Sequence, residues 1–183
     1  LYKLRNLAFD EEKSLEFFEI LCEKTAEKGF EHYEISNWAK DGKYSKHNSA
    51  YWQNEPYLGI GAGAHSYNLK ERRWNYSSLN DYINGIFTCA ESVENDKNLD
   101  YSDFSENEIL TSEDKYNDLI ITQLRTKWGL DMSLIEPKYL KHFYTEAEKF
   151  VKENHLKITD EKRAILTHSG IFISDYIMRE LMF

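Results

Sequence analysis

Cysteine, long apolar runs and positive charge are all scarce in this sequence. Cys22 and Cys89 are the two cysteines among 183 residues. Because they stand far apart, they exclude both a disulfide framework and a cysteine metal cluster. No apolar run approaches the roughly 18 residues that a membrane-spanning helix needs, and no signal-peptide pattern opens the chain. These absences predict a cytoplasmic protein without a transmembrane segment.

Acidic residues outnumber basic ones and give a formal net charge of −9. This balance argues against broad attraction to nucleic acid or to anionic membranes, so we expect no nucleic-acid partner. Hydrophobic residues make up 41% of the chain and aromatic residues 15%, which predicts an ordered globular protein of one large or two small domains. The chain begins at Leu1 and not at a methionine, and we expect it to be part of a longer protein.

Residues 1–90 predict an α/β region. An amphipathic helix ends at Gly29, and residues 30–38 follow as a strand. A helix followed closely by a strand is the second half of a βα unit, which favours a parallel sheet. Residues 57–67 are a second strand-and-loop candidate, and a further helix is expected to begin near Ser78.

Residues 91–104 are rich in Asp, Asn, Glu and Ser and predict a linker, and residues 105–183 predict a second, helical domain. Ser105 and Glu108 have capping-box spacing, which predicts the start of a helix. Two short alternating runs within residues 155–167 predict a hairpin joined by a charged turn. Helices followed by a hairpin are typical of a winged-helix-like domain.

A winged helix that binds DNA needs a basic face on its recognition helix. Over residues 113–128 the charges nearly cancel. The basic members are Lys115, Arg125 and Lys127, and the acidic ones are Glu113, Asp114 and Asp118. The balance favours a packing or partner-docking domain over a DNA-binding one.

Three glycines alternate strictly at Gly59, Gly61 and Gly63, before Ala64. Backbone can approach a ligand or a neighbouring strand closely only where no Cβ intervenes. The run is not a dinucleotide fingerprint, because Ala64 stands where the third glycine of G-x-G-x-x-G is required, and no Walker lysine follows. A tightly packed inner strand and a ligand-facing loop are equally compatible with this pattern.

His47 lies in a polar segment a few residues before Tyr51 and Trp52. A lone histidine in such a segment is usually solvated or hydrogen-bonded. Imidazole can also ligate haem iron, with neighbouring aromatic faces stacking on a porphyrin. His32 and His65 are two further metal-ligand candidates, although their spacing matches no zinc pattern.

Three motifs now carry a resemblance. They are Tyr33-Glu34-Ile35-Ser36-Asn37, His47-Asn48-x-x-Tyr51-Trp52 and Leu58-Gly59-x-Gly61-x-Gly63-Ala64-His65-Ser66. In this order and spacing they resemble the radical S-adenosylmethionine (radical SAM) proteins related to oxygen-independent coproporphyrinogen III oxidase. The His47 motif is similar to that of the haem-chaperone branch. The resemblance covers the whole chain but only about the second half of a family member.

The resemblance implies an α/β fold: the C-terminal part of a partial (β/α) radical SAM barrel, followed by the winged-helix-like domain. It implies a [4Fe-4S] cluster and S-adenosylmethionine in the full-length protein. The cluster's three-cysteine loop belongs to the half that is absent here, so this chain alone is expected to do no radical chemistry. By resemblance, the glycine-spaced strand from Gly59 to Ala64 lies on the S-adenosylmethionine side. The haem-binding residues implied are His47, Asn48, Tyr51 and Trp52, with His47 as the ligand of the iron.

Three functions remain open at this stage. The first is part of a haem chaperone that delivers haem to an acceptor protein, and the His47 motif favours it. The second is part of a true oxidase, which converts the propionates of coproporphyrinogen III to vinyl groups by radical decarboxylation. The third is a non-catalytic scaffold or a nucleic-acid-binding winged-helix module. Because a half-barrel would expose sheet edges and apolar surface, we also expect this chain to self-associate.

Overall fold

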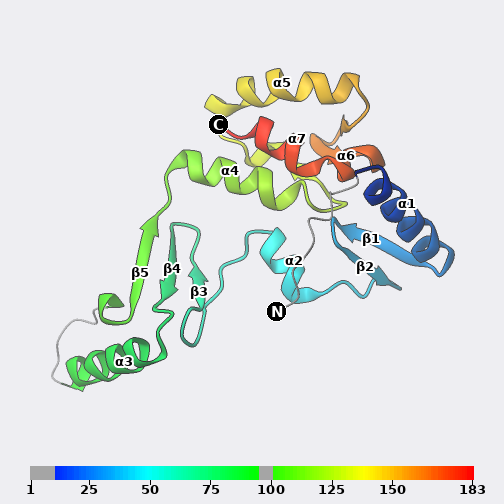
Figure 1. Ribbon diagram of the computed structural model, residues 1–183. Helices are drawn as coiled ribbons and strands as arrows, with labels where there is room; N and C mark the ends of the chain where they lie inside the picture. Colours follow the sequence, from blue (N-terminus) through cyan, green and yellow to red (C-terminus); the bar gives the residue numbers. More distant parts are fainter. Residues whose placement is uncertain (1–10, 95–100) are drawn as a thin grey trace.

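The computed structural model describes residues 11–94 and 101–183 (Figure 1). Helices pack against three small sheets, and every strand pairing between the described residues is antiparallel. An α/β composition is therefore confirmed. The described residues do not form the expected parallel sheet, because each of their strands pairs with a strand that runs in the opposite direction.

The N-terminal elements form a helix, a hairpin and a second short helix. They are α1 (Glu11–Glu27), β1 (Phe30–Glu34), β2 (Asn37–Lys40) and α2 (Lys46–Trp52). Gly29 adopts a φ of +76° between α1 and β1, a conformation that suits glycine at a helix end. The chain turns at Ile35-Ser36, and β1 pairs with β2 from Phe30↔Lys40 to Glu34↔Asn37. Because of this turn, β1 pairs with the antiparallel strand β2 and not with the parallel strand that the sequence predicted.

The middle elements form an arm that extends away from the rest of the molecule in Figure 1. They are β3 (His65–Tyr67), β4 (Glu71–Asn75), α3 (Leu79–Glu94), the 3₁₀ turn η1 (Tyr101–Asp103) and β5 (Ser105–Ile109). The sheet order is β3-β4-β5. The helix predicted to begin near Ser78 is confirmed as α3.

Two predictions about this arm are wrong. Ser105 does not begin a helix: it is the first residue of β5, which pairs with β4 from Glu71↔Ile109 to Asn75↔Ser105. The true capping box is Thr111 with Asp114, at the start of α4. The glycine run is also not a strand, because residues 58–64 form a loop that leads into β3. One sheet therefore joins two of the three predicted parts of the chain: β4 belongs to residues 1–90, and β5 belongs to residues 105–183.

The C-terminal elements form a winged-helix-like arrangement around the main hydrophobic core. They are α4 (Ser112–Gln123), β6 (Leu130–Asp131), η2 (Met132–Leu134), α5 (Pro137–Lys152), β7 (Leu156–Ile158), β8 (Arg163–Leu166), α6 (His168–Phe172) and α7 (Ser174–Leu181). The predicted hairpin is confirmed as β7–β8, with β6 as a third strand. Phe143, Phe150 and Ile177 are among the fully buried side chains that join α5 and α7.

Candidate functional site

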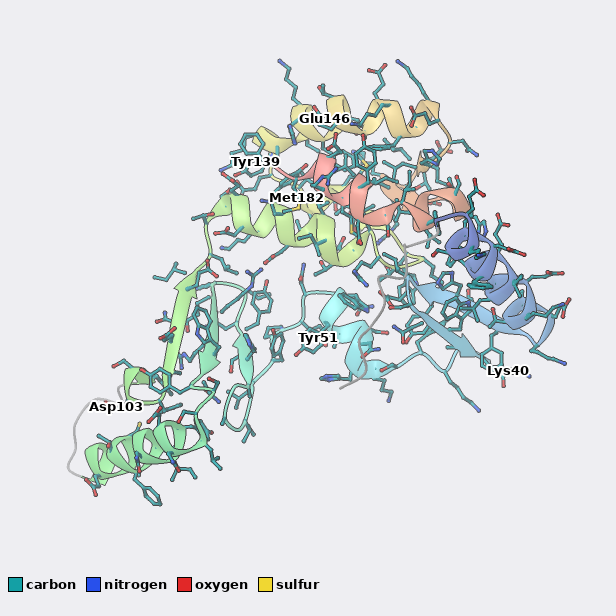
Figure 2. All side chains as sticks on the ribbon, viewed as in Figure 1. Lys40, Tyr51, Asp103, Tyr139, Glu146 and Met182 are labelled. Atoms are coloured by element: carbon teal, nitrogen blue, oxygen red, sulfur yellow. The ribbon has the colours of Figure 1, made fainter. Side chains whose placement is uncertain are left out.

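The histidine motif forms α2, which packs beneath α4 (Figure 2). Ser45 caps this helix, because its hydroxyl accepts a hydrogen bond from the backbone N–H of Asn48 at 3.3 Å. His47 is exposed in the first turn. One turn later Tyr51 lies on the same side, and the two rings meet edge to face with centroids 5.1 Å apart. The structure thus brings together two of the four predicted haem-binding side chains.

A row of aromatic rings continues from His47 toward the sheet of the arm. The ring of Tyr51 lies 4.5 Å from that of Tyr57, which lies 6.0 Å from that of Tyr67 on β3. Tyr57 and Tyr67 also exchange two backbone hydrogen bonds of 2.9 Å, which fix the end of the row at the sheet. Burial raises the pKa of both phenols, and in Tyr57 the neighbouring Tyr51 raises it further. These two phenols therefore stay uncharged at neutral pH, and the row offers apolar ring faces to a flat ligand.

Trp52 faces a different part of the molecule from His47. The guanidinium of Arg125, which follows α4, lies 4.8 Å from the centre of the Trp52 ring. The indole N–H of Trp52 is buried and has no hydrogen-bond partner among the described residues. Trp52 therefore holds α2 against the C-terminal elements. Asn48, the remaining residue of the motif, has a half-buried side chain, and its backbone N–H donates a hydrogen bond to the hydroxyl of Ser45.

Beneath this stack lies Glu34, a carboxylate that is only 1% exposed. Its Oε1 accepts a hydrogen bond of 2.9 Å from Nε of Arg125. Its Oε2 accepts hydrogen bonds from the backbone and hydroxyl of Ser36 and from the side chain of Asn37. Burial opposes ionisation, but these hydrogen bonds and the charge of Arg125 outweigh it and lower the pKa of Glu34. The motif of residues 33–37 thus has a structural role. It holds the ionised carboxylate of Glu34, which binds Arg125, and Arg125 in turn stacks on Trp52.

The structure gives two different reasons for the three glycines: lack of space for a side chain at Gly59, and a positive φ at Gly61 and Gly63. A Cβ on Gly59 would stand 2.1 Å from the carbonyl oxygen of His65, so no side chain fits there. Gly61 and Gly63 adopt φ values of +107° and +69°. At Gly59 the backbone therefore packs closely against the first residue of β3, although the run itself is a loop and not a packed inner strand. A place for this loop, including Ala64, on the S-adenosylmethionine side stays a prediction.

Asn75 and two hydroxyl groups hold the glycine loop in place. The side-chain amide of Asn75 donates to the carbonyl oxygen of Gly61 at 2.8 Å. The hydroxyl of Ser66 accepts from the N–H of Gly59 at 3.0 Å, and that of Tyr82 accepts from the N–H of Gly61 at 3.2 Å. Sequence reasoning missed these supporting residues, because no short-range pattern marks contacts from β3, β4 and α3.

The other two candidate histidines pack against tryptophan rings, and the two cysteines lie on separate helices. His32 stacks on Trp38 at 4.2 Å, and its Nε2 is 2.9 Å from the carbonyl oxygen of Ile35. His65 packs near Trp74 on β4. Cys22 and Cys89 lie on α1 and α3 and form no disulfide. Within residues 11–94 and 101–183, no three His, Cys, Asp or Glu side chains gather as a metal site would require.

Two of the three basic residues counted over residues 113–128, Arg125 and Lys127, lie beyond the end of α4 and form ion pairs. Arg125 binds Glu34, and Nζ of Lys127 lies 2.5 Å from Oε1 of Glu31 and over the ring of Tyr44. Their charges therefore hold the C-terminal elements against the β1–β2 hairpin. In the part of the chain that the structure describes, no helix is both long and apolar enough to cross a membrane.

Comparison with known proteins finds relatives that are named haem chaperones. No protein-family profile matches the chain. It is 34% identical over 170 residues to the haem chaperone HemW of Bacillus subtilis, covering 91% of this chain and 42% of that protein. HemW of Lactococcus lactis is 27% identical over 175 residues, covering 94% of this chain and 43% of that protein. This chain therefore spans about two fifths of the length of these relatives.

The fold has a counterpart of known structure. Coproporphyrinogen III oxidase (HemN) from Escherichia coli, a radical SAM enzyme, superimposes with a TM-score of 0.63 at 16% sequence identity. The match covers 95% of this chain and 42% of that one. The α/β arrangement of residues 11–94 and 101–183 is thus the fold of a corresponding part of a radical SAM enzyme.

Proposed function

Because the chain belongs to the coproporphyrinogen III oxidase-like radical SAM family, in its haem-chaperone branch, we propose that it is part of a haem chaperone, which binds haem and delivers it to an acceptor protein. The observation that carries the proposal is the exposed imidazole of His47 beside Tyr51, at the end of a row of aromatic rings. In this proposal His47 is the iron ligand.

The chemistry of these side chains suits a metalloporphyrin. An exposed imidazole can offer a ring nitrogen to the iron, and flat aromatic faces beside it can cover the apolar macrocycle. Tyr51 supplies such a face in direct contact with His47. Asn48 and Trp52 contribute by orienting α2, through the capped N–H of Asn48 and the stack of Trp52 on Arg125.

A [4Fe-4S] cluster does not fit the residues of this chain. The sequence has two cysteines, which lie on separate helices, whereas such clusters are held by several thiolates close together. We therefore assign no radical step to this chain. In the proposal, the cluster and S-adenosylmethionine belong to the part of the full-length protein that this chain does not span.

Substituting His47→Ala in the full-length protein is expected to weaken haem binding by about tenfold or more, because the iron loses a ligand. Titration of haem followed by absorption spectroscopy measures both the affinity and the change in the iron's ligand set. His65→Ala is the matched control, since His65 is also exposed but packs near Trp74. Unchanged affinity and spectrum in His47→Ala would remove His47 as the ligand. Anaerobic conversion of coproporphyrinogen III by the reduced protein would favour the oxidase instead.

This chain by itself is expected to self-associate, because several large apolar side chains are exposed on α1, α3 and the glycine loop. Leu58 and Ile60 are 80% and 83% exposed, and Phe17 and Phe87 also face solvent. Size-exclusion chromatography with light scattering should report a mass above the 21.7 kDa of one chain. The double substitution Leu58→Ser and Ile60→Ser should lower that mass. A strictly monomeric profile of the unsubstituted chain would contradict this expectation.

A further inference from the structure

The aromatic row from His47 to Tyr67 is built from two separate parts of the molecule. His47 and Tyr51 lie on α2, which packs against α4. Tyr57 and Tyr67 belong to the arm, because the two backbone hydrogen bonds between them tie the segment of Tyr57 to β3. The two parts meet where the ring of Tyr51 lies 4.5 Å from that of Tyr57. The separation of these two rings therefore depends on how the arm sits against α4.

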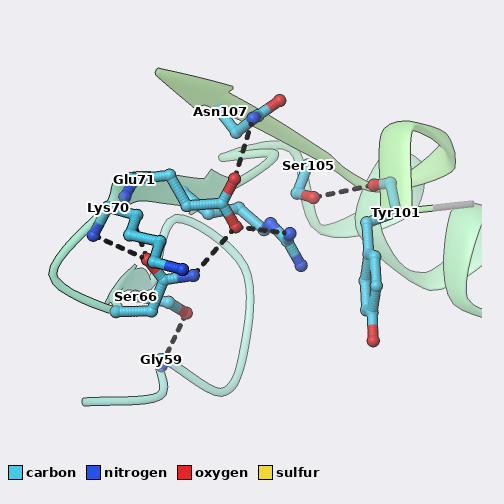
Figure 3. A network of polar contacts seen from close by, with 9 residues as sticks. Gly59, Ser66, Lys70, Glu71, Tyr101, Ser105 and Asn107 are labelled. Carbon is cyan, nitrogen blue, oxygen red and sulfur yellow. Dashed lines mark hydrogen bonds and ion pairs between the residues drawn. The ribbon is translucent and has the colours of Figure 1, made fainter. Parts of the chain in front are cut away.

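The arm is a stiff unit, because side chains join its strands in addition to the backbone ladder. On one face of the sheet, Glu71 of β4 accepts hydrogen bonds of 3.0 Å from Arg73 and of 3.2 Å from Asn107 on β5 (Figure 3). On the other face, Glu106 of β5 accepts one of 3.0 Å from the indole N–H of Trp74 on β4. A contact that fixes β4 therefore also fixes β3 and the tyrosine ring that β3 carries.

Arg72 joins β4 of the arm to α4. Its Nη2 donates a hydrogen bond to Oδ1 of Asp118, which lies within α4. Its Nη1 lies 3.9 Å from Oε2 of Glu108 on β5, which helps to orient the guanidinium. The side chain of Asp118 is only 16% exposed, so the pair is screened less than a fully exposed one. The ion pair of Arg72 with Asp118 is called the clasp below.

The clasp lies beside the aromatic row. Arg72 is the direct partner of Tyr67 in the β3–β4 register, so both side chains stand on the same face of the sheet. Clasp and row border one small cavity of about 100 Å³, whose lining includes Tyr51, Tyr57, Tyr67, Arg72 and Asp118. Burial raises the pKa of Tyr67, the charge of Asp118 raises it further, and that of Arg72 lowers it. Both charges of the clasp are therefore close to the rings of the row.

We propose that Arg72 and Asp118 are positioning residues of the haem site, whose ion pair holds the arm against α4 so that Tyr57 is aligned with Tyr51. This inference rests on the proposed haem-binding function, because only a ligand that covers both parts of the row responds to their alignment. Neither residue of the clasp binds haem itself, since each satisfies the charge of the other. The clasp acts on haem through the rings.

Haem titration of the full-length protein tests the clasp. Arg72→Gln and Asp118→Asn should each weaken haem binding by about fivefold, because the arm is released from α4. The double substitution should lose about the same factor and not the product of the two, since each single change already breaks the pair. Arg72→Lys keeps the charge and should retain most of the affinity. The absorption spectrum of bound haem should stay unchanged, because His47 is still present.

Tyr57→Leu separates positioning from a general loss of stability. It removes the ring of the arm that meets Tyr51, and should weaken haem binding by about fivefold. Adding Arg72→Gln to it should cause a further loss of less than about twofold, because the ring that the clasp aligns is gone. Lys149→Gln is the matched control. Lys149 pairs with Glu180 between α5 and α7, and its side chain has the same 38% exposure as that of Arg72. This control should leave haem binding unchanged.

The clasp is overturned if the unsubstituted protein and Arg72→Gln bind haem equally well, or if the losses from Arg72→Gln and Tyr57→Leu multiply. Tighter binding by Asp118→Asn would also overturn it, because Arg72 would then bind an acidic group of haem directly. Failure of the proposed function has a different signature. The unsubstituted full-length protein would then bind no haem, and the clasp would lose its role as well. If only the iron-ligand assignment fails, His47→Ala leaves the affinity unchanged while Arg72→Gln still lowers it.

Discussion

Replacing Arg125 by alanine should lower the free energy of unfolding by about 3–5 kcal/mol, because it leaves the carboxylate of Glu34 buried without its cation. Glu34 is 1% exposed and accepts a hydrogen bond of 2.9 Å from Arg125. The same substitution removes the cation that stacks on Trp52. Urea denaturation followed by far-ultraviolet circular dichroism measures the change.

Arg179→Ala is the control for that experiment. Arg179 lies on α7 with its side chain 72% exposed, at 3.8 Å from Glu180. An exposed pair of this kind contributes at most about 1 kcal/mol, so the control should differ little from the unsubstituted chain. Equal losses in the two variants would contradict a special role for the Glu34–Arg125 pair.

Gly59→Ala should lower the free energy of unfolding by about 3 kcal/mol, at the upper end of the usual overpacking range, because the obstacle is backbone, which cannot rotate away as a side chain can. The added Cβ would stand 2.1 Å from the carbonyl oxygen of His65 at the start of β3. Either the glycine loop or β3 must shift, and both border the aromatic row. Urea denaturation measures the stability, and haem titration of the same variant reports the effect on the site.

Gly61→Ala separates crowding from backbone conformation. No atom lies within 4 Å of a Cβ at this position, but the φ of +107° disfavours a side chain. We expect a smaller loss, of about 1–2 kcal/mol, from this conformational cost. The reverse order of the two losses would show that steric contact with β3 is not what requires glycine at position 59.

Local patterns in the sequence predicted local structure well and predicted pairing between distant segments poorly. The helix that Gly29 ends and the β7–β8 hairpin follow from neighbours in sequence, and both are confirmed. Ser105 and Glu108 match a capping box locally, yet their pairing with residues of β4, 30 or more positions earlier, decides their structure. A short-range motif cannot report a competing long-range partner.

The candidate site shows the same division. The motif resemblance found His47 and Tyr51, whose rings do meet. It grouped Trp52 with them, although Trp52 lies under Arg125 from a segment more than 70 residues later. The stack of Arg73 on Tyr101 was also missed, because Tyr101 follows α3 and lies 28 residues later in the sequence.

The pair of Glu34 and Arg125 spans 91 residues of sequence, which has a consequence for synthesis on the ribosome. The β1–β2 hairpin leaves the ribosome first. The carboxylate of Glu34 has no ion-pair partner until Arg125, which follows α4, has been translated. At about 5–20 residues per second, this interval lasts several seconds. The hairpin and α2 therefore reach their final arrangement only after the C-terminal elements have emerged, so the nascent chain completes the proposed haem site late.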